Sequence, residues 1–311
     1  MRVLFICSGN NKTNGISPFI QSQADSLVDA GLHIDFFIIT QPGIAGYFKH
    51  IFKLRRLLQN TSFDLVHAHY SLSAIVAGLA GAKPLVVSLL GSDAYIKGWM
   101  RWLTKWFYKH KWIKTIVKTS DMKARLKMDE AIVLPNGVNI NNYKPIEKQV
   151  AREKIKYTSN KKLVLFLANP KRHEKNYPLA LQAFKMLDNR HVELMPVYGK
   201  PSEIIPFYMN AADVLLLTSK WEGSVNVVKE AMACNLPIVS TDVGDVKENI
   251  KDINGCYIAS NDPVEIAGCI SKAMDFNSRT NGRERLISLG LDSETVANKL
   301  IAIYKKLLDE K

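Results

Sequence analysis

The sequence predicts an α/β protein that contains two doubly wound parallel sheets. Short apolar runs, rich in branched residues, alternate with longer amphipathic stretches along the whole chain. The apolar runs are continuous, as expected of parallel strands that are covered by helices on both faces. A chain of 311 residues is also longer than one typical hydrophobic core supports, and it suits two domains of roughly 150 residues each.

The predicted elements follow one another in a regular order. Strand-like runs occupy residues 3–7, 34–39, 65–67, 85–89, 115–118 and 132–134, and the helical patterns between them include 20–30, 47–59, 72–80 and 97–108. The same alternation begins again in the second half, with strand-like runs at 163–168, 193–197, 214–217, 238–240 and 256–258. Residues 139–160 are polar and contain Pro145, which is typical of a linker. We expect an N-terminal domain over 1–145, a C-terminal domain over 146–292, and a final helix within 293–311 that packs back on the N-terminal domain.

The cysteine content favours a cytoplasmic protein. The four cysteines are scattered in apolar surroundings, without the spacing of metal ligands, so we interpret them as reduced core thiols. The N-terminal run is too short for a signal peptide, and no apolar run has the length of a transmembrane helix.

The net charge of +13 indicates an anionic partner. The segment from Lys97 to Lys127 contains many basic residues and a single acidic residue, Asp121. Four of the five tryptophans also lie in this segment. On a helical wheel the bases form one stripe and the aromatic side chains lie opposite, which is typical of a helix in a membrane interface. The segment from Tyr47 to Leu57 is similar. We expect both to contact an anionic membrane surface. The alternative is a helix that packs on the sheet with a solvated basic face.

Nucleic acid is a less favoured partner, because the chain contains no RNP, KH or helix-turn-helix pattern.

Two carboxylates mark the most informative segment. Glu222 lies on a Gly-containing turn, and Glu230 follows eight positions later in a helical pattern. At the helical rise eight residues span roughly 12 Å, which is about the distance from the sugar to the ribose of a nucleotide-sugar. Ionised carboxylates accept hydrogen bonds from hydroxyl pairs, and N–H groups at a helix start suit a diphosphate. The alternative is two solvated glutamates on a surface helix.

Polar loops are predicted at the carboxyl ends of the first-domain strands, where open parallel sheets bind ligands. The loop from Ser8 to Gly15 is rich in glycine and asparagine and suits a phosphate or sugar, although it matches neither GxGxxG nor a Walker loop. Of His67 and His69, we expect one to pack in the core and the other, His69, to face the ligand edge. The stretch Gly91-Ser92-Asp93 brings a hydroxyl and a carboxylate to the same edge, unless it only caps the following helix.

The corresponding loop of the second half, from Asn169 to Asn176, is basic. Arg172 and Lys175 in it are well placed to neutralise a diphosphate leaving group. The alternative is a solvated charged loop.

Several stretches together resemble glycosyltransferase family 4. In chain order they are Leu134-Pro135-Asn136-Gly137-Val138-Asn139 with Tyr143-Lys144-Pro145, the basic loop over 168–176, residues 212–219, the region from Glu222 to Ala233, and residues 237–244. The resemblance covers nearly the whole chain and is strongest over 211–248. It implies the GT-B architecture, in which two Rossmann-like domains face each other across a cleft.

The resemblance also implies roles for the matching residues. Glu222 would hold hydroxyls of the transferred sugar, and Arg172 and Lys175 would stabilise the departing diphosphate, so these three form the expected catalytic set. The expected donor-binding residues are Glu230, which would hold the ribose, with Gly223, Ser224, Val225, Asn226 and Asn169. The expected acceptor-side residues are Gly15, His69, Ser92 and Asp93.

The chain departs from the family pattern at three positions. Gly244 precedes Asp245 where a Gly-Gly pair is common, Val225 replaces a frequent proline, and Leu90 stands where many members have a histidine.

The expected function is that of a retaining transferase that moves a sugar from a nucleotide-sugar, with a UDP-sugar favoured, to a lipid-linked saccharide acceptor. Such an enzyme would build a cell-surface polysaccharide or glycolipid at the cytoplasmic face of the membrane. We expect no cofactor and no metal, because no Asp-x-Asp pair is present to clamp one on the diphosphate. The alternatives are a nucleotide-sugar epimerase of the same architecture and a non-catalytic, membrane-associated partner subunit.

Overall fold

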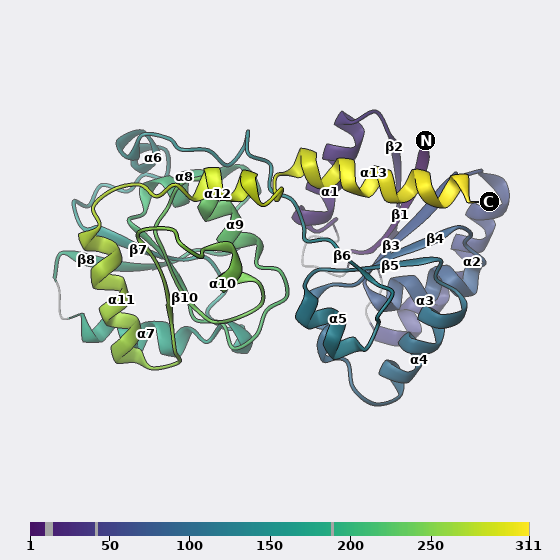
Figure 1. Cartoon of the computed structure of the whole chain (residues 1–311), viewed down its shortest axis with the longest axis horizontal. Helices are drawn as coiled ribbons and strands as arrows, with labels where there is room; N and C mark the ends of the chain where they lie inside the picture. The colour runs from purple at the N-terminus through teal and green to yellow at the C-terminus, as the bar shows by residue number, and fades with distance from the viewer. Residues whose placement is uncertain (10–14, 41–42, 188–189, 311) are drawn as a thin grey trace. The chain divides into compact units, whose positions relative to one another are not determined.

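The chain forms two compact units, as seen in a computed structural model that describes residues 1–9, 15–40, 43–187 and 190–310 (Figure 1). Unit 1 comprises Met1–Gly137 and Ser293–Lys311, and unit 2 comprises Val138–Asp292. This division lies before residue 145, because Val138, Ile140 and Tyr143 pack against the core of unit 2.

Unit 1 contains a six-stranded parallel sheet in the order β2-β1-β3-β4-β5-β6. Its strands are β1 (Arg2–Ser8), β2 (His33–Ile39), β3 (Leu65–His69), β4 (Leu85–Ser88), β5 (Lys114–Val117) and β6 (Ile132–Val133). Its helices are α1 (Pro18–Asp29), α2 (Gly43–Asn60), α3 (Ser71–Ala80), the 3₁₀ helix η1 (Gly91–Tyr95), α4 (Gly98–His110), α5 (Ser120–Leu126) and α13 (Ser293–Asp309).

Both faces of this sheet are buried. Side chains of β1 alternate, so that Leu4 and Ile6 join a core with α2, α3, α4 and α5, whereas Val3 and Phe5 join a core with α1 and α13. Because both sets are apolar, the strand reads as a continuous hydrophobic run, which is why the sequence predicts a parallel sheet.

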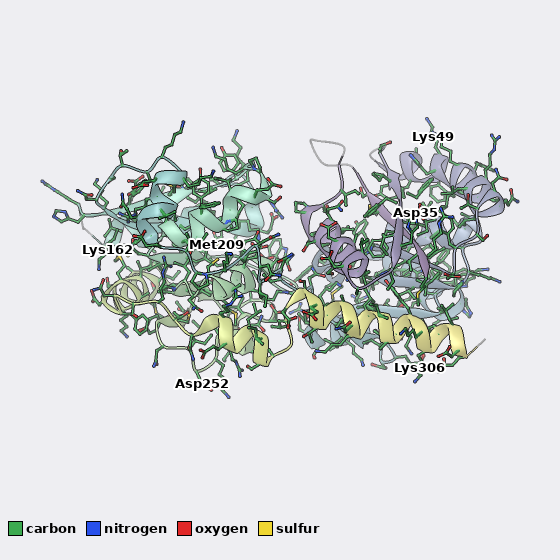
Figure 2. The ribbon with its side chains drawn as sticks, turned by 90° about the horizontal axis from the view of Figure 1, so that it is seen from above. Asp35, Lys49, Lys162, Met209, Asp252 and Lys306 are labelled. Atoms are coloured by element: carbon green, nitrogen blue, oxygen red, sulfur yellow. The ribbon has the colours of Figure 1, made fainter. Side chains whose placement is uncertain are left out.

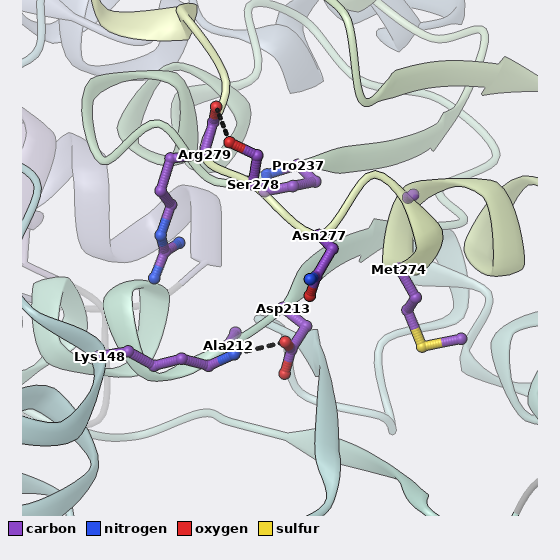
Figure 3. A pocket seen from close by; sticks show the side chains of 9 residues that line it. Lys148, Ala212, Asp213, Pro237, Met274, Asn277, Ser278 and Arg279 are labelled. Carbon is purple, nitrogen blue, oxygen red and sulfur yellow. Dashed lines mark hydrogen bonds and ion pairs between the residues drawn. The ribbon is translucent and has the colours of Figure 1, made fainter.

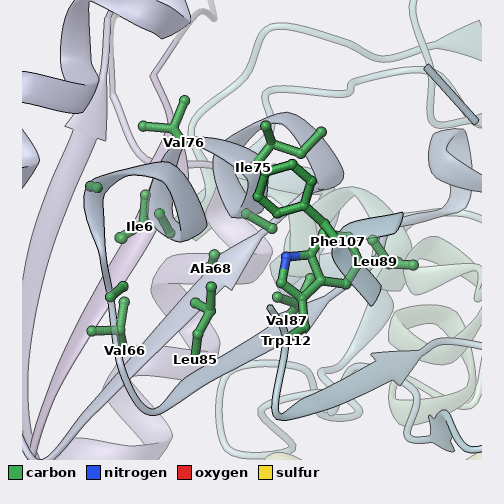
Figure 4. Packing of buried hydrophobic residues seen from close by; sticks show 14 of the residues in the cluster. Ile6, Val66, Ala68, Ile75, Val76, Leu85, Val87, Leu89, Phe107 and Trp112 are labelled. Carbon is green, nitrogen blue, oxygen red and sulfur yellow. The ribbon is translucent and has the colours of Figure 1, made fainter. Parts of the chain in front are cut away.

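The helix layer of the first core packs closely around one aromatic side chain. Phe107 of α4 lies beside Ile75 of α3 and Trp112 (Figure 4). A Cβ atom at Gly78 would lie 2.8 Å from Cε1 of Phe107, so the absence of a side chain at this position allows α3 and α4 to approach.

Unit 2 contains a five-stranded parallel sheet in the order β11-β10-β9-β7-β8. Its strands are β7 (Lys162–Phe166), β8 (Val192–Pro196), β9 (Val214–Leu217), β10 (Ile238–Thr241) and β11 (Cys256–Ala259). Its helices are α6 (Lys148–Lys154), η2 (His173–Lys175), α7 (Tyr177–Met186), η3 (Ser202–Ile204), α8 (Ile205–Ala211), α9 (Asn226–Ala233), α10 (Val246–Asn249), α11 (Pro263–Asp275) and α12 (Gly282–Ser288). Met209 of α8 lies in the core on one face of this sheet (Figure 2), and α7 and α11 cover the other face.

The predicted fold class is confirmed, since each unit has a parallel sheet with helices on both faces. The strand order reverses between β1 and β3 in unit 1, and between β7 and β9 in unit 2. Ligands of doubly wound sheets bind at such a switch point, beyond the carboxyl ends of the strands. In unit 2 this point lies between the loops that carry Lys175 and Glu222.

Candidate functional site at the switch point of unit 2

An ion pair lies at the switch point of unit 2. The ammonium group of Lys175, which ends η2, pairs with Oε1 of Glu222 in the loop after β9. Ser219 donates a hydrogen bond of 2.8 Å to the same carboxylate oxygen. The two charged side chains are only 13% and 18% exposed, so water screens their interaction weakly. The structure thus joins residues that are far apart in the sequence and that were assigned different parts of one ligand.

Hydrogen bonds from the end of β9 hold the loop after β7. The hydroxyl of Thr218 donates to the backbone carbonyls of Lys175 (3.2 Å) and Asn176 (3.1 Å), and the N–H of Lys220 donates to the carbonyl of Glu174 (2.9 Å). The position of Lys175 is therefore set by the neighbouring strand as well as by its own loop.

The other two predicted residues of this loop have different surroundings. Arg172 is exposed and pairs with Glu174, at 2.6 Å between Nε and Oε1. The side-chain oxygen of Asn169 accepts the N–H of Lys171 at 2.9 Å, so Asn169 shapes the turn that presents Arg172.

The loops after β9 and β10 touch at a pair of glycines. Gly244 has a φ of +60°, and a Cβ atom there would lie 1.9 Å from the carbonyl oxygen of Gly223. Asp245 then accepts hydrogen bonds from the Ser224 hydroxyl (2.7 Å) and from the N–H of Val225 (2.9 Å). The turn that was predicted to meet the sugar and the phosphate is thus held by the loop after β10.

Helix α9 begins at Asn226, so Glu222 precedes it and only Glu230 lies inside it. The helical rise therefore applies to part of the segment, and the separation of roughly 12 Å estimated from eight helical residues does not describe it. The local reason is that the segment from Glu222 to Val225 forms a turn tied to Asp245.

Glu230 is half-buried and receives a hydrogen bond from the hydroxyl of Tyr143. Burial raises the pKa of Glu230 to about 7, although the neighbouring Lys229 and the Tyr143 hydrogen bond both act to lower it. Lys229 is fully buried, and burial lowers its pKa to about 8 against the effects of Asp245 and Glu230.

Several polar residues of this site were not predicted as site residues, among them Tyr143, Asp245 and Lys229. Tyr143 lies in the stretch that resembles the family, Asp245 was noted as a departure from it, and Lys229 precedes Glu230. The hydroxyl group of Tyr143, within that stretch, was the signal that could have indicated a hydrogen-bond partner for Glu230.

The predicted acceptor-side residues of unit 1 differ in how far they are buried. Contrary to the expectation that His69 faces the ligand edge, both His67 and His69 are buried, with ring centroids 4.3 Å apart. Residues two apart on a strand share a face, and in β3 that face is covered. His67 bonds Tyr304 of α13 (2.5 Å) and Ser88 (2.9 Å), and burial lowers the pKa of His69 to about 3.

Asp93 is also buried, and its carboxylate accepts the N–H groups of Ser71 (3.2 Å) and Leu90 (2.6 Å). Because Ser71 is the first residue of α3, Asp93 caps that helix. Burial raises the pKa of Asp93 to about 6, and its hydrogen bonds act against this rise. Ser92 is exposed and Gly15 is partly exposed. Residues 10–14 of the predicted Gly- and Asn-rich loop lie outside the described residues.

A cavity of about 190 Å³ lies at the opposite edge of the second sheet, where Lys148 pairs with Asp213 (Figure 3). Asp213 and Pro237 immediately precede β9 and β10, so this cavity is at the amino ends of the strands and is separate from the site. Among the described residues, no group of three or more His, Cys, Asp or Glu side chains could hold a metal ion. Within the same part of the chain, no helix is both long and apolar enough to cross a membrane.

Comparison with known proteins identifies the family. The family model described as Glycosyltransferase Family 4 matches residues 3–142, and the one described as Glycosyl transferases group 1 matches residues 182–275. The chain belongs to glycosyltransferase family 4. The resemblance drawn from the sequence is thereby confirmed.

Curated glycosyltransferases match this chain at low identity. The UDP-Gal:alpha-D-GlcNAc-diphosphoundecaprenol alpha-1,3-galactosyltransferase of Escherichia coli is 24% identical over 301 residues, which cover 81% of this chain and 74% of that protein. The chain spans 54% and 66% of the length of two further curated relatives.

Solved structures share the fold along the chain. Sucrose-phosphate synthase from Thermosynechococcus elongatus has a TM-score of 0.81 at 16% identity and covers 100% of both chains. Anabaena Alr3699/HepE, solved in complex with UDP, has a TM-score of 0.77 at 16% identity and covers 98% of this chain and 100% of its own. At these identities the likeness concerns the fold, and the GT-B class expected for a family 4 glycosyltransferase is confirmed.

Proposed function

We propose that the protein is a retaining glycosyltransferase that moves a sugar from a nucleoside-diphosphate sugar, with a UDP-sugar favoured, to a lipid-linked saccharide in the synthesis of a cell-surface polysaccharide or glycolipid. Transfer as such follows from the family. The observation that carries the donor assignment is the Lys175–Glu222 pair at the switch point of unit 2. The UDP in the Alr3699/HepE structure and the lipid-linked acceptor named for the E. coli relative support the finer statement.

In this proposal the two charges exchange partners when the donor binds. Lys175 would turn to the diphosphate together with Arg172, and Glu222 would accept hydroxyls of the sugar. Lys175 would then have an anionic partner and Glu222 would have hydrogen-bond donors, so the ligand would replace the contacts of the ion pair. N–H groups in the first turn of a helix have no partner within the helix, so the start of α9 adds to the attraction for phosphate.

The rate acceleration would come from positioning and from stabilising charge on the leaving diphosphate. Arg172, Lys175 and the helix start supply this stabilisation without a metal ion, which is the basis for proposing metal-independent transfer. Glu230, with the Tyr143 hydroxyl against it, would hold the ribose hydroxyls at the other end of the donor.

The lipid-linked acceptor agrees with the surface of unit 1. Helices α2, α3 and α4 cover one face of the first sheet, and their outer side exposes large apolar residues beside lysines and arginines. These residues are Phe48, Phe52, Leu79, Trp99, Trp102 and Trp106. The predicted aromatic stripe of α4 is divided, because Phe107 packs in the core whereas the three tryptophans are exposed. An exposed tryptophan set beside basic residues suits an anionic membrane surface, and we propose peripheral membrane attachment there.

The test is a screen of the purified protein by thermal shift and by product analysis. A panel of nucleotide-sugars is added first without and then with lipid-linked saccharide acceptors, and a ligand of the native state raises the melting temperature. Sugar transfer only in the presence of an acceptor is the expected result. Conversion of the donor to an epimer without any acceptor would instead identify an epimerase, and the absence of any nucleotide-sugar binding would favour a non-catalytic subunit.

A further inference from the structure

A hydrogen-bonded network connects a buried cation, Lys229, with an anion, Asp245, beneath the turn formed by residues 223–225. The ammonium group of Lys229 donates to the hydroxyl oxygen of Ser224 at 2.8 Å, and this hydroxyl donates to Asp245 at 2.7 Å. Asp245 also accepts the N–H of Val225 at 2.9 Å, directly before α9 begins. Lys229 has no exposed surface, and Asp245 is partly exposed.

The position of Lys229 directs its charge toward the start of the helix. Side chains of an α-helix lean toward its N-terminus, and Lys229 in the first turn of α9 reaches back to Ser224, which precedes the helix. Its positive charge therefore lies under the turn formed by Gly223, Ser224 and Val225. Asp245 brings a negative charge to the same turn from the loop after β10.

The network is more than a brace for the turn, because a buried charge acts over several ångströms in surroundings of low dielectric constant. A lysine buried here costs desolvation free energy, which a neutral residue in the same space would avoid. Gly244 already brings the two loops into contact through the backbone alone. Backbone contact between the two loops therefore does not depend on these charges, whose electrostatic effect reaches the turn.

We propose that Lys229 and Asp245 act with opposite sign on the affinity for the diphosphate of the donor, Lys229 attracting it and Asp245 repelling it, while Ser224 holds the two charges beneath the turn. This inference rests on the proposed function, because it requires a nucleoside diphosphate at this turn. Neither residue touches the reacting atoms, and both are positioning residues that set the electrostatic potential of the site. The opposed pair keeps affinity for the diphosphate moderate, so that the product nucleotide can leave.

The experiment measures binding of nucleoside diphosphates to the whole chain by titration calorimetry. UDP, GDP and ADP are compared on the unmodified protein, and the tightest is carried to K229M, D245N and the double variant. We expect K229M to weaken binding on the order of tenfold and D245N to strengthen it severalfold. The affinity of the double variant should be close to that of the unmodified protein. Uridine, or the matching nucleoside, lacks the phosphates, so its affinity should not change in opposite directions in the two single variants.

An exposed ion pair on the same loop region is the matched control. Lys247 and Asp242 lie 3.7 Å apart, with side chains 65% and 57% exposed. Because solvent screens such a pair, K247M and D242N should leave the affinity for the nucleoside diphosphate within about twofold. Melting temperatures of all variants are recorded, and K229R, which keeps the charge, tests the lysine if K229M does not fold.

The possible results separate the two proposals. If K229M and D245N change affinity in the same direction, or if neither changes it, the network is structural and the inference is overturned, although nucleotide binding by the unmodified protein still supports the proposed function. If the unmodified protein binds no nucleoside diphosphate, both proposals fail. The inference is established if the affinity for the nucleoside diphosphate changes in opposite directions in K229M and D245N and the affinity for the nucleoside does not.

Discussion

Lys175 and Glu222 form an ion pair between the loops that follow β7 and β9, at the point where the strand order of the second sheet reverses. Ser219 adds a hydrogen bond to the same carboxylate. Under the proposed function, a donor that binds here replaces the pair with its own hydroxyls and phosphates. Donor binding would then supply the free energy for opening the pair, so substitution of either residue should change donor binding.

Substitution of Lys175 by methionine should lower turnover by about 10²-fold, because a fixed donor to a developing anion is typically of that importance. Loss of the ammonium group also leaves Glu222 without its charged partner, so the melting temperature should fall. The measurement compares K175M with the unmodified protein in the rate at which each releases the nucleotide from the same nucleotide-sugar donor.

The control for this variant is K171M, in the same loop. Lys171 is exposed, and its removal changes the net charge equally. Equal losses in the two variants would mean that only the overall charge of the loop matters and would contradict the assigned role of Lys175.

Nucleotide affinity should depend on pH through Glu230, whose pKa is raised to about 7 by burial. An ionised carboxylate accepts hydroxyl hydrogen bonds better than a protonated one, so the affinity should increase as the pH rises from 6 to 8. The variant E230Q has no carboxylate to titrate at this position and should lose this increase, so that its remaining pH dependence comes from the nucleotide and from Lys229, whose pKa is about 8. Titration calorimetry of UDP across this range provides the comparison.

The Tyr143 hydroxyl should shift this midpoint. Its hydrogen bond to Glu230 favours the ionised carboxylate and acts to lower the pKa. In Y143F the midpoint should therefore lie at higher pH than in the unmodified protein. A midpoint that moves to lower pH would show that this hydroxyl does not donate to Glu230.

Replacement of Gly244 by alanine should destabilise unit 2. The position combines a φ of +60° with a Cβ placement 1.9 Å from a backbone oxygen of Gly223, so the two loops must separate. A loss of about 2 kcal/mol in the free energy of unfolding is expected from strain of this kind. Urea denaturation measures it.

Gly268 is the control for that substitution. It lies within α11, and a Cβ atom there would meet nothing within 4 Å beyond its chain neighbours and the backbone of its own helix. Alanine at this position should stabilise the protein by about 0.5–1 kcal/mol, because it favours the helix. Destabilisation of similar size at both positions would exclude the loop contact as the cause.

Removal of the exposed tryptophans should weaken vesicle binding. Trp99 and Trp102 of α4 are 59% and 67% exposed. The double substitution to alanine should reduce flotation with vesicles that contain anionic lipid, and neutral vesicles should bind less of the unmodified protein than anionic ones. Trp221, which is 39% exposed in unit 2, provides the control substitution. Equal binding of both variants would remove the membrane proposal.

The fold could be predicted from the sequence because its signals are local. The continuous apolar run over 163–166 follows from the burial of both faces of β7, with Leu163 and Leu165 in one core and Val164 and Phe166 in the other. Each strand carries such a signal in its own residues, so the order of the strands was predicted correctly and their ends only approximately. The polar segment over 139–160 was predicted to be a linker, but it contains the short helix α6.

The arrangement of the site could be predicted only in part. The residue types at the carboxyl ends of β7 and β9 were recognised, but the pairing of Lys175 with Glu222 depends on a contact across the sheet. The same holds for Tyr143 with Glu230 and for Lys229 with Asp245. The burial of His69 is a related case, because it depends on which helices cover β3 and not on the strand itself.

The first unit is discontinuous in the chain, since α13 follows the whole of unit 2 and yet supplies Tyr304 to the buried imidazole of His67. During synthesis, residues 1–137 leave the ribosome well before their last core helix does. Unit 2 is contiguous and can fold as soon as residue 292 has emerged. Residues 1–137 lack α13 until then, and the apolar face of the first sheet that α13 covers stays exposed. We therefore expect chaperone contact during translation mainly at the part of the protein that is made first.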